Sequence, residues 1–411
     1  MSGLRSIPYH VATTTYRFIL KGAYAGVRTQ PKVRNDSQTL LLIRTDEIGD
    51  FVLFTPMLKH LRAIYRDYKI SLVVNEQFLN LAETCPYVDE VIPCKVKRYR
   101  WNFLYRLNFI RHLRARAFDA AIYPLYSREP LGDEILYCSG AAERIGFDGN
   151  FSSKARCSKT QNNRYYTRLI GSRHTMGTEL ERNQGFVEHL FGGKISESDF
   201  APELWLTQED RSFVSGLLEE AGLDSSRDLI VILFPGASWS GKIWPPNNYA
   251  RLADQLVERY GARMVICGGP RDIPVTSAVA AQMKGDPTVL AGRTTLRQLA
   301  ALLEVCALYV GNDTGPLHVA VTIGIPTLCI MGGGQFGRFY PYGDLDKHRM
   351  VFKEMPCYHC DWHCMYETTR CIQEISLDAV WHDARRLVEE IVLPSRDAFS
   401  AASQEQARPE Q

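Results

Sequence analysis

The feature that most constrains the fold of this chain is the alternation of short apolar runs with helix-like stretches. Strand-like runs recur in two series, LLLIRT (40–45), ISLVVN, DEVIPC and AAIYPL, then LIVILF (229–234), ARMVICG, PTVLA, ALYVG and PTLCIM. Buried strands joined by helices indicate parallel sheets with helices on both faces. We therefore expect an α/β protein of two doubly wound, Rossmann-like domains that face a central cleft, with ligands at the carboxyl ends of the strands.

The alternating pattern lapses around residues 196–210, where polar residues gather, and we expect the domain boundary there. The predicted organisation is a basic N-terminal extension (1–37), an N-terminal Rossmann-like domain (38–205), a C-terminal Rossmann-like domain (206–376), a C-terminal helix (377–395) and a disordered tail (396–411).

Charge and hydropathy exclude several classes of function. A net charge of +2 over 411 residues gives no indication of a nucleic-acid partner. No apolar run is long enough to span a bilayer, and Arg17 and Lys21 interrupt the first apolar stretch, so we expect no signal peptide. A cytoplasmic location follows, and the 11 cysteines are then expected to be thiols or metal ligands rather than a disulfide framework.

Two segments are strongly basic. Residues 1–35 carry six Lys/Arg and no acid, and residues 95–116 carry eight with several aromatic residues. One interpretation is a surface for an anionic membrane, on its cytoplasmic face, or for an acidic acceptor. The alternatives are a poorly ordered extension for the first segment and the solvated face of an ordinary helix for the second.

The stretch VGNDTGPLHVA (310–320) predicts an anion site. A strand ends there and a helix begins, with Asp313, Thr314 and Gly315 in the turn and His318 in the first helical turns. The unpaired N–H groups and the dipole of a helix N-terminus both favour an anion. Pro316 suits this place because its missing N–H would be unpaired anyway.

Three further loops at predicted strand ends carry anion-binding or acid–base groups. RTDEIGD places Asp50 where the first helix begins, although it could be a plain N-cap. FPGASWSGKIWPPNNY contains Lys242, which can reach a phosphate or remain an exposed lysine. GGPRD ends with Asp272, which could accept ribose hydroxyls or cap a helix. Small residues open the last two loops: Gly236, Ser238 and Gly268.

Together these motifs resemble the glycosyltransferase family nine heptosyltransferases, which have the GT-B fold. The resemblance covers roughly residues 38–395. It is carried by IRTDEIGDFVLFTPML, SGAAERIGF, FPGASWSGKIWP, ICGGPRD and above all GNDTGPLHVAVTIGIPTLCI. It implies an inverting transfer of a sugar, heptose from ADP-heptose, onto a bacterial surface glycan, a lipopolysaccharide core or a protein acceptor.

The resemblance also implies that domain 38–205 is the acceptor side and that domain 206–376 binds the nucleotide sugar. It implies roles for single residues as well. Asp50 is expected to be the general base and Lys242 a phosphate clamp. Asp272 stands where many relatives have a glutamate near the nucleoside. The expected donor-binding residues are Gly236, Ser238, Lys242, Gly268, Asp272, Asp313, Thr314, Gly315 and His318.

The chemistry implied by the resemblance needs no catalytic metal. Amides, a lysine and a protonated His318 could stabilise the leaving diphosphate, and closure of two domains would bring Asp50 to the donor. Two alternatives stay open: a GT-B-fold sugar-nucleotide epimerase, whose extra acidic and histidine groups are not seen, and a nucleotide-sugar-binding protein without catalysis, against which Asp50 and Lys242 argue.

The segment MPCYHCDWHCMYETTRC is rich in thiols. Its C-x2-C-x3-C-x6-C spacing favours a structural zinc or iron ion held by Cys357, Cys360, Cys364 and Cys371. Many members of the resembled family have a similar segment, and in relatives that glycosylate autotransporters it is expected to hold iron. The alternative is free thiols packed under a loop. Either way the segment is predicted to be structural and not needed for the chemistry.

Overall fold

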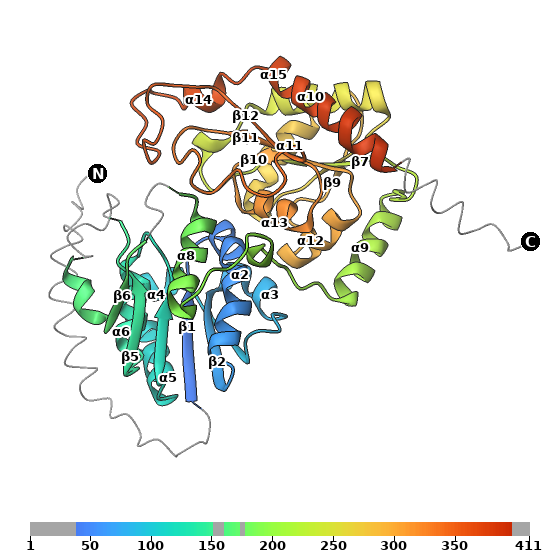
Figure 1. Ribbon diagram of the computed structural model, residues 1–411. Coiled ribbons are helices and arrows are strands. Elements are labelled where there is room, and N and C mark those ends of the chain that lie inside the picture. The colour runs from blue at the N-terminus through green and yellow to red at the C-terminus, as the bar shows by residue number, and fades with distance from the viewer. Residues whose placement is uncertain (1–37, 151–159, 173–176, 397–411) are drawn as a thin grey trace, which may run out of the picture. The chain divides into compact units, whose positions relative to one another are not determined.

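The computed structural model describes residues 38–150, 160–172 and 177–396, which form two compact units (Figure 1). The first unit comprises described residues of 38–45, 65–76 and 88–172. The second comprises 46–64, 77–87 and the described residues beyond 173. Segments 46–64 and 77–87 therefore cluster with the C-terminal part of the chain, although they connect strands of the first sheet.

The first unit contains a six-stranded parallel sheet among its described residues, in the order β3-β2-β1-β4-β5-β6. Its strands are β1 (Gln38–Arg44), β2 (Tyr68–Asn75), β3 (Glu90–Cys94), β4 (Ala120–Tyr123), β5 (Glu143–Phe147) and β6 (Arg168–Ile170). Its helices are α4 (Val96–Trp101), α5 (Phe103–Ala115) and α6 (Pro130–Cys138). Leu41, Ile43 and Val73 pack with Ile110 and Ile135 in one apolar core. The expected doubly wound order is present.

The second unit has its own six-stranded parallel sheet, in the order β12-β11-β10-β7-β8-β9. Its strands are β7 (Ile230–Phe234), β8 (Arg263–Ile266), β9 (Thr288–Val289), β10 (Leu308–Asn312), β11 (Thr327–Met331) and β12 (His348–Phe352). The chain reverses its winding direction between β7 and β10, and ligands of such sheets bind beyond the carboxyl ends of the strands at this switch point. The prediction of two parallel-sheet α/β domains is confirmed.

The second unit also contains helices from separate parts of the chain. They are α2 (Ile48–Ile64), α3 (Leu79–Ala82), α8 (Glu179–Phe191), α9 (Gln208–Glu220), α10 (Pro246–Tyr260), α11 (Ile273–Ala280), α12 (Leu296–Glu304), α13 (Gly315–Ile323), α14 (Arg370–Gln373) and α15 (Leu377–Leu387). One core joins Val52 and Leu53 of α2 with Leu317 and Ala320 of α13. The predicted last helix continues past α15 as a π-helical turn, Val388–Val392.

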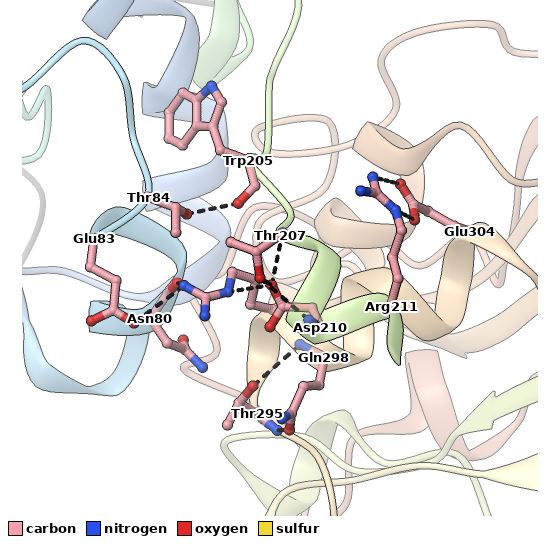
Figure 2. Close-up of polar contacts among 11 residues, drawn as sticks. Asn80, Glu83, Thr84, Trp205, Thr207, Asp210, Arg211, Thr295, Gln298 and Glu304 are labelled. Carbon is pink, nitrogen blue, oxygen red and sulfur yellow. Dashed lines mark hydrogen bonds and ion pairs between the residues drawn. The ribbon is translucent and has the colours of Figure 1, made fainter. Parts of the chain in front are cut away.

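Arg297 of α12 forms hydrogen bonds to both α3 and α9. Figure 2 labels its partners Asn80, Glu83 and Asp210. Its Nε donates to Asp210 Oδ2 at 2.6 Å, and its Nη1 donates to the Asn80 carbonyl at 3.1 Å and to Glu83 Oε1 at 3.2 Å. Asp210 also accepts from the Thr207 amide and hydroxyl, which closes the N-terminal cap of α9. The largely buried ion pair thus joins α12 to α9, and the same arginine holds α3 through the Asn80 carbonyl and the half-exposed Glu83.

In the described part of the chain, no helix has the length and apolar character that crossing a membrane requires.

Candidate functional site

The candidate site lies where the loops after β7, β8 and β10 leave the second sheet. Asn312, the last residue of β10, is fully buried and fixes the β7 loop. Its Nδ2 donates to the Pro235 carbonyl at 2.8 Å, while its Oδ1 accepts from the Trp244 amide at 3.3 Å and from the Tyr249 hydroxyl at 3.0 Å. Two loops that are distant in sequence are therefore held side by side by one amide side chain.

Lys242 and Asp313 meet at this switch point. Lys242 Nζ lies 3.9 Å from Asp313 Oδ2, and the two side chains are only 17% and 7% exposed. Lys242 comes from the short 3-10 turn after β7, Ser240–Lys242, and Asp313 directly follows β10. An ammonium partly shielded from water interacts more strongly with a bound anion than a surface lysine does.

The N-terminus of α13 is open to a hydrogen-bond acceptor. Thr314 is the N-cap residue, but its side chain makes no capping hydrogen bond to the first turn. Gly315 begins the helix, and a Cβ at this position would lie 2.6 Å from Ile48 Cβ, so glycine is needed for the close approach of α2. The first turn therefore keeps the partial positive charge of a helix start.

His318 lies in the interior and not on the surface of the site. Its side chain is 3% exposed, its Nδ1 lies 3.2 Å from the Tyr342 hydroxyl, and its ring stacks on Tyr342. Burial lowers the pKa of His318 to about 4. The charge of Asp313 opposes this shift, and the charge of Lys242 adds to it, both to a smaller extent. The expectation of a protonated His318 is therefore wrong at neutral pH, because a charged imidazole would lose its hydration there.

Asp272 brings the β8 loop to the β7 loop. A Cβ on Gly236 would lie 2.3 Å from the Asp272 carboxyl carbon, and one on Gly268 would lie 2.7 Å from Asp272 Cβ. Asp272 Oδ2 accepts from the Gly269 amide at 2.8 Å. Burial raises the pKa of Asp272, and the Gly269 hydrogen bond and Arg271 counteract it. Both glycines are thus explained by packing around one carboxyl group.

Asp50 is the third residue of α2 and is half-buried. The residue before it, Gly49, touches His318: a Cβ on Gly49 would lie 2.7 Å from His318 Cδ2. The start of α2 therefore lies against α13 within one unit, beside the switch-point loops. The sequence had suggested that domain closure is needed to bring Asp50 to the donor loops. Instead, packing within the second unit already brings its helix to α13.

Ser238 differs from the other predicted donor-binding residues in its exposure and contacts. Ser238 is exposed, and among the described residues no hydrogen bond ties it to the rest of the site. The other predicted donor-binding residues lie in the three adjoining loops and in α13, as expected for parallel strands that end at one edge.

Sequence reasoning missed the contact between the cysteine-rich segment and the β7 loop. The ring centroid of Trp362 lies 4.6 Å from Lys242 Nζ. Thr369 Oγ1 donates to the Gly241 carbonyl at 2.6 Å, and Gln373 Nε2 donates to the Ile243 carbonyl at 2.9 Å. These contacts place the segment against the β7 loop, while the prediction that it is structural and not needed for the chemistry stays a prediction. The sequence signal that could have indicated this contact is Trp362, a large aromatic residue between Cys360 and Cys364.

The metal prediction for the same segment gains no support. Cys357, Cys360 and Cys364 are half-buried and Cys371 is buried, all as free thiols. Burial raises the pKa of Cys371, and the three other cysteines raise it further. Within the described residues, no three His, Cys, Asp or Glu side chains are grouped closely enough to hold a metal ion. The metal ion held by these four cysteines therefore stays a prediction, as does the alternative of free thiols packed under a loop.

The chain is similar to known proteins in both sequence and fold. The chain is 24% identical over 360 residues to the lipopolysaccharide core heptosyltransferase OpsX of Haemophilus influenzae, covering 85% of this chain and 97% of that protein. A family 9 glycosyltransferase from Veillonella parvula matches the fold with a TM-score of 0.72, 22% identity and coverage of 87% and 100%.

A second solved structure is Escherichia coli heptosyltransferase WaaC with ADP-2-deoxy-2-fluoro heptose, at a TM-score of 0.60, 17% identity and coverage of 86% and 99%. The family model for glycosyltransferase family 9 (heptosyltransferase) matches residues 106–366, more than half of the chain. The switch-point loops described above thus belong to an enzyme, and this chain is a member of glycosyltransferase family 9.

Proposed function

We propose that this enzyme transfers heptose from ADP-heptose to the core of a bacterial lipopolysaccharide, with inversion at the anomeric carbon. The name of the Haemophilus relative supports the acceptor class, and the nucleotide sugar in the Escherichia coli structure supports the donor. The observation that carries the proposal is the meeting of Lys242, Asp313 and the uncapped start of α13 at one switch point.

The donor diphosphate would bind at this switch point. The Gly315 end of α13 offers N–H groups and the positive end of the helix dipole. Lys242 adds a charge that a diphosphate oxygen can share, and Asp313 keeps that ammonium in place at 3.9 Å. Asp272, beside the glycines of the neighbouring loops, is suited to hydroxyls of the nucleoside ribose. The neutral His318 would contribute packing rather than charge.

The transfer step would use Asp50 as the base. An acceptor hydroxyl attacks the anomeric carbon, its proton passes to the Asp50 carboxylate, and the new C–O bond forms on the face opposite the diphosphate. The anomeric C–O bond to the diphosphate breaks, and its electron pair leaves with ADP. Lys242 and the α13 amides stabilise the negative charge that develops on the leaving group. The α2 helix that carries Asp50 shares a hydrophobic core with α13, whose N-terminus would bind the leaving group, and this packing supports the assignment.

Turnover with a defined acceptor tests this proposal. The enzyme should release ADP from ADP-heptose only when a heptose-accepting core oligosaccharide is present, and NMR should show the opposite anomeric configuration in product and donor. Retained configuration would refute inversion. If the enzyme releases ADP from other ADP-sugars but not from ADP-heptose, the proposed donor is refuted. Rearrangement of the donor sugar without an acceptor would support the epimerase alternative.

We also propose that the α4–α5 corner contacts an anionic membrane on which such an acceptor lies. Trp101 and Leu104 are 84% and 69% exposed at the junction of the two helices. Lys97 and Arg98 of α4 and Arg111 of α5 are exposed in the same two helices. Apolar side chains flanked by cations suit a membrane interface, and each cation near the surface contributes about 1 kcal/mol. The other basic segment, 1–35, lies outside the described residues.

Co-sedimentation with vesicles tests the membrane contact. The full chain should bind vesicles rich in phosphatidylglycerol more than phosphatidylcholine vesicles, and high salt should weaken binding. Replacing both Trp101 and Leu104 by Ser should reduce binding, while Met365→Ser, at a residue 74% exposed in the other unit, should not. Equal binding to both vesicle types, or unchanged binding of the double variant, would exclude this corner.

A further inference from the structure

Trp362 occupies a special position over the donor-site lysine. Its ring centroid lies 4.6 Å from Lys242 Nζ, within the range of a cation–π contact. The same ammonium lies 3.9 Å from Asp313 Oδ2. Lys242 is therefore held between a carboxylate and an aromatic face, and both partners restrict where its charge can point.

The fold holds the indole of Trp362 from several sides. Cβ atoms on Gly332 and Gly334, which follow β11, would lie 2.8 Å and 2.4 Å from indole atoms, so the ring lies directly against this backbone. The Asp361 amide donates to the Gly334 carbonyl at 2.9 Å. Trp239 contacts the ring edge-on, with centroids 5.8 Å apart. The indole is thus a fixed wall and not a mobile surface side chain.

One unfavourable feature indicates that this ring does more than fill space. Trp362 Nε1 is buried without a hydrogen-bond partner among the described residues, and such a lost bond costs about 1–3 kcal/mol. Phenylalanine would fill the space without this cost, but its face attracts a cation less than that of tryptophan. The left-handed backbone of Trp362, with a φ of 63°, belongs to the turn, because His359 and Asp361 share it.

We propose that Trp362 is a positioning residue for donor binding, because its indole face holds the Lys242 ammonium toward the diphosphate site. This inference rests on the proposed donor site. It gives the cysteine-rich segment a part in function: the segment carries the aromatic wall of the phosphate clamp. Trp362 need not touch the donor, since it acts through Lys242.

A double-mutant cycle with ADP as the probe tests the coupling. Trp362→Leu should weaken ADP binding, measured by calorimetry, by about 3- to 30-fold, the range of a partly desolvated cation–π contact. Trp362→Phe should keep part of the affinity. In a Lys242→Met background, Trp362→Leu should change affinity less than about 2-fold, because the partner of the ring is already gone.

Control variants separate this role from support of the segment as a whole. Met365→Ala lies in the same segment and is exposed, so it should bind ADP like the wild type. Thr369→Val removes the hydrogen bond to the Gly241 carbonyl but leaves the ring in place. If Thr369→Val loses as much affinity as Trp362→Leu, or if the Trp362→Leu loss persists in Lys242→Met, Trp362 is only a structural anchor.

A measurement without ligand keeps the inference separate from the proposed donor. Amine labelling of Lys242, followed by peptide mass spectrometry, should be several-fold faster in Trp362→Leu than in the wild type, and nearly unchanged in Trp362→Phe and Met365→Ala. Equal labelling in wild type and Trp362→Leu would overturn the inference. If Lys242 is labelled faster in Trp362→Leu than in the wild type but the wild type does not bind ADP, the inference about Trp362 holds and the donor in the proposed function is refuted.

Discussion

Gly49 and His318 are in direct contact: a Cβ placed on Gly49 would lie 2.7 Å from Cδ2 of the buried imidazole. Because the ring is also stacked on Tyr342, it has little room to move away. Glycine at the start of α2, next to Asp50, is therefore required by a neighbour from α13.

Gly49→Ala should lower the free energy of unfolding by about 1–3 kcal/mol, since an added methyl group overpacks a filled interior. Chemical denaturation measures the change. Gly216→Ala in α9 is the matched control, because a Cβ there meets nothing within 4 Å. Adding His318→Ala should recover part of the loss. A Gly49→Ala protein as stable as Gly216→Ala would show that the two helices separate freely.

Asp50→Asn should reduce turnover by about 10²–10⁴-fold, the usual contribution of a general base. Affinity for ADP should stay within a few-fold of the wild type, because shape is kept and Lys242 is untouched. Steady-state kinetics and calorimetry measure the two effects. Asp67→Asn, with a side chain 89% exposed, is the control. Near-normal turnover of Asp50→Asn would reject the base and leave Asp46 or Glu47 as the next candidates.

Lys242→Ala should weaken ADP binding by about 10- to 100-fold, because a charge-assisted hydrogen bond to phosphate is lost. Asp313 would then face the diphosphate without its cation partner. Calorimetry measures the loss. Lys284→Ala, at a lysine with a side chain 76% exposed, should bind ADP normally. Unchanged affinity in Lys242→Ala would remove Lys242 from the donor site.

Acidification should destabilise the second unit through His318. The unfolded chain binds a proton near the ordinary pKa of 6.5, whereas the buried imidazole does so only near 4. The unfolded state therefore holds more protons between these values, and stability falls as pH falls through this window, by up to about 3 kcal/mol. His318→Gln should make the stability profile less steep between pH 6.5 and 4 without levelling it, because burial also lowers the pKa of His348 to about 4. Identical slopes in both proteins would contradict the buried neutral imidazole.

Arg297→Met should lower the free energy of unfolding by about 3 kcal/mol, since it leaves the buried carboxylate of Asp210 without its cation. The pair that Arg293 makes with Glu220 is exposed on both sides. Arg293→Met should therefore cost less than about 1 kcal/mol, as surface pairs do. Denaturant unfolding of both variants gives the comparison. Equal losses would mean that the contacts drawn in Figure 2 are no stronger than surface pairs.

Local pattern determined the strands and the loops that end them. β1, β7 and β10 fall where LLLIRT, LIVILF and ALYVG predicted them, because a buried strand must consist of apolar residues wherever the rest of the chain goes. The turn in VGNDTGPLHVA likewise contains a strand end, proline and glycine in a few consecutive residues. Such signals act over short distances, so they can be interpreted without the tertiary structure.

Tertiary structure decided what the residues far apart in sequence do together. His318 is neutral because Gly49 and Tyr342 enclose it, and no neighbour in the sequence reveals that burial. Trp362 faces Lys242 only because the segment after β12 folds back onto the β7 loop. Desolvation and cation–π attraction both depend on distance through space, which a single sequence does not contain. The sequence by itself thus determined the class of fold and the candidate loops, and packing determined the charge and the partners of their side chains.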